Sequence, residues 1–402
     1  MSELNFARGV TAMKGEAAYR VMAQAAALEA QGKSVIHLEI GQPDFPTPPR
    51  ALEAGMKALH EGKTRYVAPL GIPEFRNALA AYVARTRGIH MSTSSIAVTP
   101  SGKTAILLAM AAVLEKGDEV IFPDPGFPTY ADLVAFFGAV ARPVPLREAS
   151  GFSFDREALR AAFSPKTKLV IINSPSNPTG GVHNISELEY LAGLVRASNA
   201  WVLSDEIYSR IVYDGMQCAP SIVSLPDMQA RTFLLDGFSK TYAMTGWRLG
   251  FLAFPSRFEN AMDMLLMNTV GCTAPFVQYA GLAALDEDES VRHMVSEFET
   301  RRNYLVSALN KISGVRCAMP RGAFYAFPNV NLVTQSAQQL ADFLLREAGV
   351  ALLSGSAFGK EGETYLRISY AASLETLKEG VSRIAYGVQL FGEKIDRERK
   401  IR

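Results

Sequence analysis

Cysteine is scarce in this chain, with only three among its 402 residues, at positions 218, 272 and 317. They lie far apart and form no Cys-x-x-Cys pair, which argues against a disulfide framework or a zinc site, and no metal site is predicted. We therefore expect a reducing compartment, the cytoplasm. We also expect Cys218, Cys272 and Cys317 to be small buried side chains.

Long hydrophobic runs and an excess of charge of one sign are also missing. No run approaches the length of a membrane span, and residues 1–20 have interleaved charges instead of the apolar core of a secretory signal. The 41 Lys and Arg residues balance 40 Asp and Glu residues, so the formal net charge is +1. Such a chain has no strong field for nucleic acid or an anionic membrane, and we expect a soluble globular protein.

The length of 402 residues is too great for one ordinary core and predicts two domains. Between residues 50 and 286, strand and helix patterns alternate, and the apolar runs 169–172 and 201–203 are typical of strands buried on both faces. This predicts a large α/β domain with a mostly parallel sheet flanked by helices, with ligands at the carboxyl ends of its strands. Residues 1–49 and 287–402 are expected to form a smaller α+β domain.

The hydrophobic periodicity sets the expected elements. In the large domain, the expected helices span residues 51–61, 74–86, 103–114, 128–137, 186–198 and 276–286, and the expected strands span 96–99, 119–123, 139–145, 169–173, 201–205 and 232–236. Elsewhere we expect helices at 16–31, 290–309 and 337–348, strands at 35–40, 323–327 and 364–369, and a solvated helix end at 392–402.

One lysine and one arginine stand in an apolar, glycine-punctuated run, Lys240 in Phe238-Ser239-Lys240 and Arg248 eight residues later. Apolar surroundings disfavour the charged form of a lysine, which makes its amine a better nucleophile and base. The run fits a lysine that binds an aldehyde cofactor and an arginine that binds the cofactor's phosphate. A buried strand end with a surface lysine is the plainer alternative.

Further polar residues follow other predicted strands. The turn 101–103 opens a helix whose N–H groups can bind phosphate, although an ordinary N-cap by Ser101 explains it equally well. Asn177 lies in a turn made rigid by prolines. Asp205 ends an apolar strand, so its carboxylate is expected to be buried and to need a partner such as a protonated pyridine nitrogen.

Three further side chains near these positions also have candidate roles. Tyr208 can donate a hydrogen bond to a phenolate-type oxygen, and Glu206 is expected to be structural. Phe127 offers an aromatic face at another strand end, with core packing as the alternative.

Together these residues resemble the pyridoxal-phosphate-dependent aminotransferases of class I/II, fold type I, over residues 12–385, and prokaryotic aspartate aminotransferases among them. The resemblance implies pyridoxal 5'-phosphate as the cofactor, bound by Lys240, with Asp205 beside its pyridine nitrogen. It implies further cofactor contacts from Ser101, Gly102, Lys103, Phe127, Asn177, Tyr208, Ser239 and Arg248, and substrate contacts from Arg367, Gly41, Asn177 and Lys103. Tyr66 resembles the tyrosine that reaches the phosphate of the neighbouring subunit, which implies a homodimer with shared active sites.

The implied activity is transfer of the amino group of an L-amino acid to a 2-oxo acid by a ping-pong mechanism, catalysed by Lys240, Asp205 and Tyr208, with glutamate and 2-oxoglutarate as one pair. Gly237 departs from the pattern, because many relatives carry a serine phosphate donor there; Ser239 is the candidate replacement. Lys103 resembles a lysine that some prokaryotic aspartate aminotransferases carry in this turn, which favours a dicarboxylic substrate, and Glu16 opposes it. Aspartate-like specificity and specificity for aromatic or other neutral amino acids therefore both stay open.

Two alternatives use the same residues. A β-lyase or decarboxylase of the same fold would share Arg367 and Tyr66. A non-catalytic sensor with an aminotransferase-like domain would need a basic winged-helix segment before the domain. We expect the fold to begin almost at Met1, which disfavours the sensor.

Overall fold

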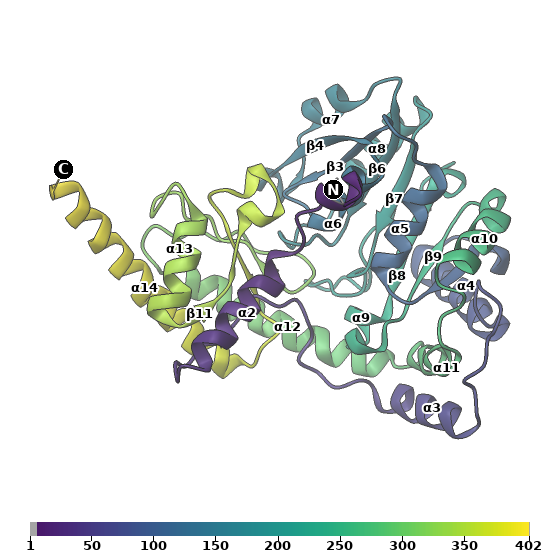
Figure 1. Ribbon diagram of the computed structural model, residues 1–402, viewed down its shortest axis with the longest axis horizontal. Helices are drawn as coiled ribbons and strands as arrows, with labels where there is room; N and C mark the ends of the chain where they lie inside the picture. Colours follow the sequence, from purple (N-terminus) through teal and green to yellow (C-terminus); the bar gives the residue numbers. More distant parts are fainter. Residues whose placement is uncertain (1–5, 402) are drawn as a thin grey trace, which may run out of the picture.

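The computed structural model describes residues 6–401 and consists of two parts that lie side by side (Figure 1). The larger part is built on an eight-stranded sheet with the order β2-β9-β8-β7-β6-β3-β4-β5. Its strands are β2 (Ile96–Thr99), β3 (Glu119–Asp124), β4 (Val140–Arg147), β5 (Ser153–Phe154), β6 (Thr167–Asn173), β7 (Trp201–Asp205), β8 (Thr232–Gly237) and β9 (Gly250–Ala253).

The sheet is mostly parallel, with β9 antiparallel to both of its neighbours and β5 antiparallel to β4. The central strands β6 and β7 are almost entirely buried, as their continuous apolar runs predicted. Because β3, β6, β7 and β8 are parallel neighbours, their carboxyl ends meet at one edge. The predicted fold class, an α/β sheet flanked by helices, is confirmed.

Helices cover both faces of this sheet. One face packs against α5 (Gly102–Val113), α6 (Pro128–Phe136) and α10 (Glu259–Thr269). The other packs against α4 (Pro73–Arg87), α7 (Arg156–Ala162), α8 (Ile185–Arg196) and α11 (Pro275–Ala284), while α3 (Pro49–His60) lies against α11. The short α9 (Phe238–Thr241) directly follows β8. All six predicted helices and six predicted strands of this part are present within a few residues.

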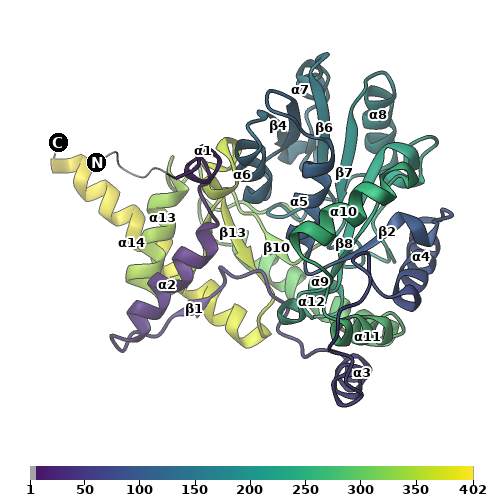
Figure 2. The same cartoon turned by 45° about the vertical axis from the view of Figure 1, so that its right-hand side comes forward.

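The smaller part contains segments from both ends of the chain (Figure 2). It comprises α2 (Ala17–Glu29), β1 (Ile36–His37), α12 (Asp288–Leu309), β10 (Tyr325–Ala326), α13 (Ala337–Phe343), β11 (Val350–Ala351), β12 (Leu353–Ser354), β13 (Leu366–Ser369) and α14 (Leu374–Ile401). β1 pairs with β11, and β13 lies between β10 and β12. The expected strands here are present but shorter, and one π-helical turn, Leu344–Ala348, follows α13. The domain division at residues 50 and 286 stays a prediction.

The segment before α2 lies against the larger part of the molecule. Its first helix, α1 (Arg8–Thr11), lies against α6 (Figure 2). The backbone N–H groups of Lys14 and Gly15 donate to the carboxylate of Asp132 on α6, at 2.9 and 3.1 Å. This contact fixes the segment that leads into α2.

The prediction of three buried cysteines was wrong for two of them. Cys317 is buried, but Cys218 and Cys272 are only half-buried. Both lie in segments between regular elements, which run close to the surface of a folded chain. Among residues 6–401, no helix is long and apolar enough to cross a membrane. The last predicted helix continues to Ile401, and residue 402 lies outside the described residues.

Candidate active site

A cavity of about 710 Å³ lies at the carboxyl edge of the large sheet, where the two parts of the molecule meet. Twelve of the predicted site residues line it: Gly41, Ser101, Gly102, Lys103, Phe127, Asn177, Asp205, Tyr208, Ser239, Lys240, Arg248 and Arg367. Tyr66 does not line it, because its side chain is 95% exposed on the loop between α3 and α4. All the binding and catalytic residues predicted from the sequence, except Tyr66, therefore line one cavity.

Asp205 lies at the end of β7 and is buried. Its carboxylate accepts hydrogen bonds from the Tyr130 hydroxyl at 2.7 Å and from the backbone N–H of Ile207 at 3.2 Å. Burial raises the pKa of Asp205 to about 6, and those two hydrogen bonds oppose the rise. A carboxylate in this setting favours a cationic neighbour on its cavity side.

Lys240 lies on α9, directly after β8. Its ammonium donates to the carbonyl oxygen of Gly41 and lies 6.0 Å from the Tyr208 ring centre and 5.8 Å from the Phe324 ring centre. Removal from water, followed by the positive charge of Arg367, lowers the pKa of Lys240 to about 8. The amine is thus easier to deprotonate than an ordinary lysine.

Arg367 reaches the cavity from β13 and is buried. One of its Nη atoms donates to Asn177 Oδ1 at 3.2 Å, and the other donates to the carbonyl oxygen of Glu39. Its guanidinium stacks between the rings of Tyr325 and Phe358, at 4.6 and 5.0 Å. Within the described chain, its Nε is buried without a hydrogen-bond partner, while each Nη carries a second N–H that can donate to an anionic ligand.

Tyr208 and Tyr325 share a hydrogen bond of 2.8 Å between their hydroxyl groups. Burial, and next the neighbouring Tyr325, raise the pKa of Tyr208 well above its usual value, so it keeps its proton at neutral pH. Tyr325 also explains Gly41, since a Cβ atom on that glycine would lie 2.0 Å from the Tyr325 hydroxyl oxygen. A side chain at position 41 would therefore displace the tyrosine pair.

The other end of the cavity is formed by the N-terminus of α5. Ser101 caps this helix, with its Oγ accepting from the Thr104 N–H at 3.1 Å, so the plain capping interpretation is confirmed for its side chain. Arg248 is exposed at this end, in a left-handed backbone conformation with φ 57°, and donates to the Thr245 carbonyl at 2.7 Å. Ser239 is buried beside the cavity.

Gly237 lies where strands approach closely. A Cβ atom there would lie 3.0 Å from both the Gly250 Cα and the Ile207 Cδ1, and one on Gly250 would lie 3.0 Å from the backbone of the Ser101–Gly102 turn. β8, β9 and the start of α5 thus stack through glycines. The missing serine at position 237 has a packing explanation.

Lys103 and Glu16 form an ion pair at the mouth of the cavity. The Lys103 nitrogen also lies 5.8 Å from the Phe127 ring centre and 5.9 Å from that of Tyr19. Cationic and aromatic groups therefore line the same side of the site. The Glu16 side of this pair belongs to the segment that Asp132 anchors.

Four aromatic residues that line the cavity were missed from the sequence: Tyr19, Tyr130, Tyr325 and Phe358. Tyr130 follows Phe127 by three residues, a helical spacing that places both on one face and could have indicated it. Tyr325 is a phenol in an otherwise apolar run, and a buried phenol needs a partner. Phe358 has no local signal. Among residues 6–401, no group of three or more His, Cys, Asp or Glu side chains is arranged to hold a metal ion.

Comparison with known proteins gives consistent matches along the chain. Residues 33–384 match the family described as aminotransferase class I and II. An aspartate aminotransferase of Pyrococcus horikoshii is 39% identical over 365 residues, 90% of this chain and 92% of that relative. The aromatic-amino-acid aminotransferase 2 of Thermococcus litoralis is 39% identical over 377 residues, 92% of this chain and 94% of that relative.

Solved structures agree with these matches. The crystal structure of an aspartate aminotransferase from Rhizobium meliloti superimposes with a TM-score of 0.92 at 34% identity, covering 96% of this chain and 99% of that one. The resemblance expected from the strand-end residues is therefore confirmed over the sequence and the fold. This chain belongs to the class I and II aminotransferase family.

Proposed function

We propose that this aminotransferase uses pyridoxal 5'-phosphate, held at the described cavity, to transfer the amino group of an L-amino acid to a 2-oxo acid in two half-reactions. Members of its family use this cofactor. The observation that carries the proposal is the buried Asp205, which Tyr130 and Ile207 hold at the end of β7 in the same cavity as Lys240.

The residues present fit the cofactor. Asp205 would pair with the protonated pyridine nitrogen, and Lys240 would bind the aldehyde carbon. The first turn of α5 and Arg248 would hold the phosphate. The remaining N–H groups on the two Nη atoms of Arg367 would hold the substrate carboxylate. Ser101, Gly102, Lys103, Phe127, Asn177, Tyr208, Ser239 and Gly41 would complete the contacts as the sequence predicts.

The bound cofactor supplies an electron sink that stabilises negative charge at the substrate Cα. Lys240, whose pKa is lowered to about 8, would be the base that takes the proton from the substrate Cα. Asp205 would stay ionised beside a protonated pyridine nitrogen, and Tyr208, which keeps its proton, would donate to the cofactor's phenolic oxygen. Arg367 fixes the carboxylate, which orients the Cα–H bond.

The ion pair between Lys103 and Glu16 supports two substrate classes. With an acidic donor such as aspartate, Lys103 would leave Glu16 and bind the distal carboxylate. With an aromatic donor, the pair would stay closed and the rings of Phe127 and Tyr19 would contact the side chain. Named relatives of both kinds support this pair of classes. We propose glutamate and 2-oxoglutarate as the other pair of the cycle.

We further propose a homodimer with shared sites, located in the cytoplasm. The exposed Tyr66 supports the dimer, as do the exposed apolar side chains of the preceding α3: Leu52, Met56 and Leu59. The scarcity of cysteine supports a reducing compartment, and fractionation of the source cells tests it.

The decisive experiment is the Lys240→Ala variant, with the exposed Lys311→Ala as the control. We expect the Lys240→Ala variant to lose transamination and the yellow absorbance of the lysine-bound cofactor. The Lys311→Ala variant should keep both. Full turnover without Lys240 would overturn the proposal.

A donor screen of the holoenzyme then resolves substrate specificity. Lys103→Met should lower kcat/KM for aspartate by about 10- to 100-fold, the loss of one charge-assisted hydrogen bond, and leave aromatic donors nearly unchanged. Glu16→Gln should favour acidic donors. Equal losses for both classes in Lys103→Met would contradict a role in side-chain selection.

A further inference from the structure

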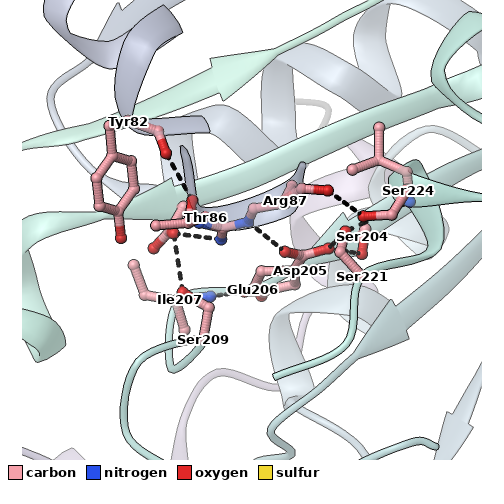
Figure 3. A network of polar contacts seen from close by, with 12 residues as sticks. Tyr82, Thr86, Arg87, Ser204, Asp205, Glu206, Ile207, Ser209, Ser221 and Ser224 are labelled. Carbon is pink, nitrogen blue, oxygen red and sulfur yellow. Dashed lines mark hydrogen bonds and ion pairs between the residues drawn. The ribbon is translucent and has the colours of Figure 1, made fainter. Parts of the chain in front are cut away.

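A buried ion cluster lies behind the candidate active site (Figure 3). Arg87, the last residue of α4, donates from Nε to Glu206 Oε2 at 3.0 Å and from Nη2 to Asp236 Oδ2 at 2.6 Å. The exposed fractions of the three side chains are 0%, 3% and 1%. None of these residues was assigned a role in binding or chemistry above.

Short polar side chains complete the cluster, as Figure 3 shows. The Ser204 hydroxyl donates to Glu206 Oε1 at 2.7 Å, and the Ser221 hydroxyl donates to the same oxygen. Ser209 donates to Asp236 Oδ2 at 3.0 Å, and Ser224 donates to the Arg87 carbonyl at 2.6 Å. A buried network with its members satisfied in this way has one well-defined geometry.

The cluster joins the two strand ends that carry the proposed catalytic residues. Glu206 directly follows Asp205 at the end of β7, and its N–H donates to the Leu235 carbonyl of β8 at 2.8 Å. Asp236 precedes Gly237, whose N–H donates to Asp236 Oδ1 at 2.7 Å, and α9 with Lys240 begins one residue later. The Arg87 guanidinium thus binds Glu206, which is adjacent to Asp205, and Asp236, which lies at the end of the strand that leads to Lys240.

We propose that Arg87 is a positioning residue that clamps the ends of β7 and β8 together and so fixes Asp205 relative to Lys240. The inference rests on the roles proposed above for those two residues. Arg87 itself reaches neither the cavity nor the reacting atoms. It acts through Glu206 and Asp236.

The cluster also sets the charge behind Asp205. The Asp236 and Glu206 carboxylates both raise the pKa of Asp205, and the Arg87 cation lies between those two carboxylates. Without Arg87, two buried negative charges would act on Asp205 without compensation and would favour its protonated form. The other titratable groups around Asp205 and the cluster are Tyr82, Tyr130, Tyr208, Arg210, Cys218 and Tyr242.

The geometry requires an arginine. The two carboxylates bind different nitrogens of one planar group, a fork that a lysine ammonium on a flexible stem does not reproduce. Arg87→Lys keeps the charge and loses the fork. Comparison of the lysine and methionine variants therefore separates the two contributions.

The test compares Arg87→Met and Arg87→Lys with Arg302→Met, each as holoenzyme. Arg302 on α12 is the control, because its side chain is also buried and pairs at 2.9 Å with Asp214, an exposed carboxylate in the segment between β7 and β8 that does not belong to the Arg87 cluster. We expect Arg87→Met to lower kcat by about 10- to 100-fold, as displacement of catalytic groups does, while KM for the amino donor changes little. Arg87→Lys should lie between Arg87→Met and the wild type.

A second readout is the pH at which cofactor retention falls to half, measured by equilibrium dialysis. This midpoint should move upward in Arg87→Met, because Asp205 is then protonated at higher pH, and should stay constant in Arg302→Met. Should Arg87→Met fail to fold, Glu206→Gln, which removes one of the two clamped carboxylates, is measured in the same two ways. Its kcat should fall, while its pH midpoint should move downward, because one of the negative charges that raise the pKa of Asp205 is gone.

Equal kcat and equal pH midpoints in Arg87→Met and Arg302→Met would overturn the inference and leave Arg87 a stabilising residue only. The Lys240→Ala result separates the two proposals. If that variant remains active, the proposed function fails; if it is inactive while Arg87→Met behaves as the control, only the positioning role fails.

Discussion

Burial shifts the pKa values of the two central ionisable residues, Asp205 and Lys240, in opposite directions. The pKa of Asp205 rises to about 6 and that of Lys240 falls to about 8, because the charged form of each loses hydration. Both residues are thus held in environments that favour their neutral forms. A bound cofactor with a cationic ring would reverse this preference for Asp205, which links cofactor binding to ionisation of the site.

This shift predicts a stability gain for Asp205→Asn in the cofactor-free protein. The pKa of Asp205 is raised from 3.8 to about 6 in the folded chain, so stability decreases as pH rises through that interval. The uncharged asparagine escapes this loss. We expect its free energy of unfolding to exceed that of the wild type by about 2–3 kcal/mol near pH 7, and the excess to vanish near pH 4.

Urea unfolding at the two pH values measures the difference, with Asp118→Asn as the control. Asp205→Asn should also bind the cofactor poorly. Asp205 would then be a residue that lowers the stability of the cofactor-free protein but is needed for cofactor binding. An excess stability that does not depend on pH would contradict the assigned pKa shift.

At the scale of elements, strand β9 joins the segments at the end of the cavity that we propose to hold the cofactor's phosphate. It lies antiparallel between β2 and β8, and its first residue, Gly250, touches both Gly237 and the turn that opens α5. The positions of the α5 N-terminus and of α9 therefore depend on a stack of glycines. At these positions the backbone segments approach so closely that only glycine, which has no side chain, fits between them.

Gly237→Ser tests this packing. Serine would restore the phosphate donor that many relatives carry, but its Cβ would lie 3.0 Å from Gly250 and from Ile207. We expect a loss of about 1–3 kcal/mol in the free energy of unfolding, typical of overpacking, and no gain in cofactor affinity. Gly193→Ser on α8, where a Cβ meets no atom within 4 Å, is the control. Tighter cofactor binding without a loss of stability would refute the packing explanation.

The sequence predicted elements and strand-end residues well because both leave local signals: apolar periodicity and polar residues after a buried strand. Long-range pairing leaves none, so the insertion of β9 between β2 and β8 was not foreseen. Arg87 directly follows the predicted helix 74–86, and nothing local to it indicates burial. Its burial depends on Glu206 and Asp236, which lie 119 and 149 positions away.

At the scale of the whole molecule, the proposed dimer can be tested through Tyr66. We expect twice the mass of one chain in analytical ultracentrifugation, and a cofactor affinity reduced by about 10-fold in Tyr66→Phe, the loss of one hydrogen bond to a charged phosphate. Tyr386→Phe, exposed on α14, is the control. An active monomer, or unchanged cofactor affinity in Tyr66→Phe, would contradict the shared site.

The contact between Arg367 and the carbonyl of Glu39 joins positions 328 residues apart. Synthesis proceeds from the N-terminus, so Asp205 and Lys240 leave the ribosome long before Arg367 does. The side of the cavity that we propose to bind the substrate carboxylate cannot form until β13 has been made and has met the segment after β1. A nascent chain would thus carry the residues proposed to hold the cofactor before it carries the arginine proposed to hold the substrate, and a chain that stopped between α9 and β13 would contain the first set without the second.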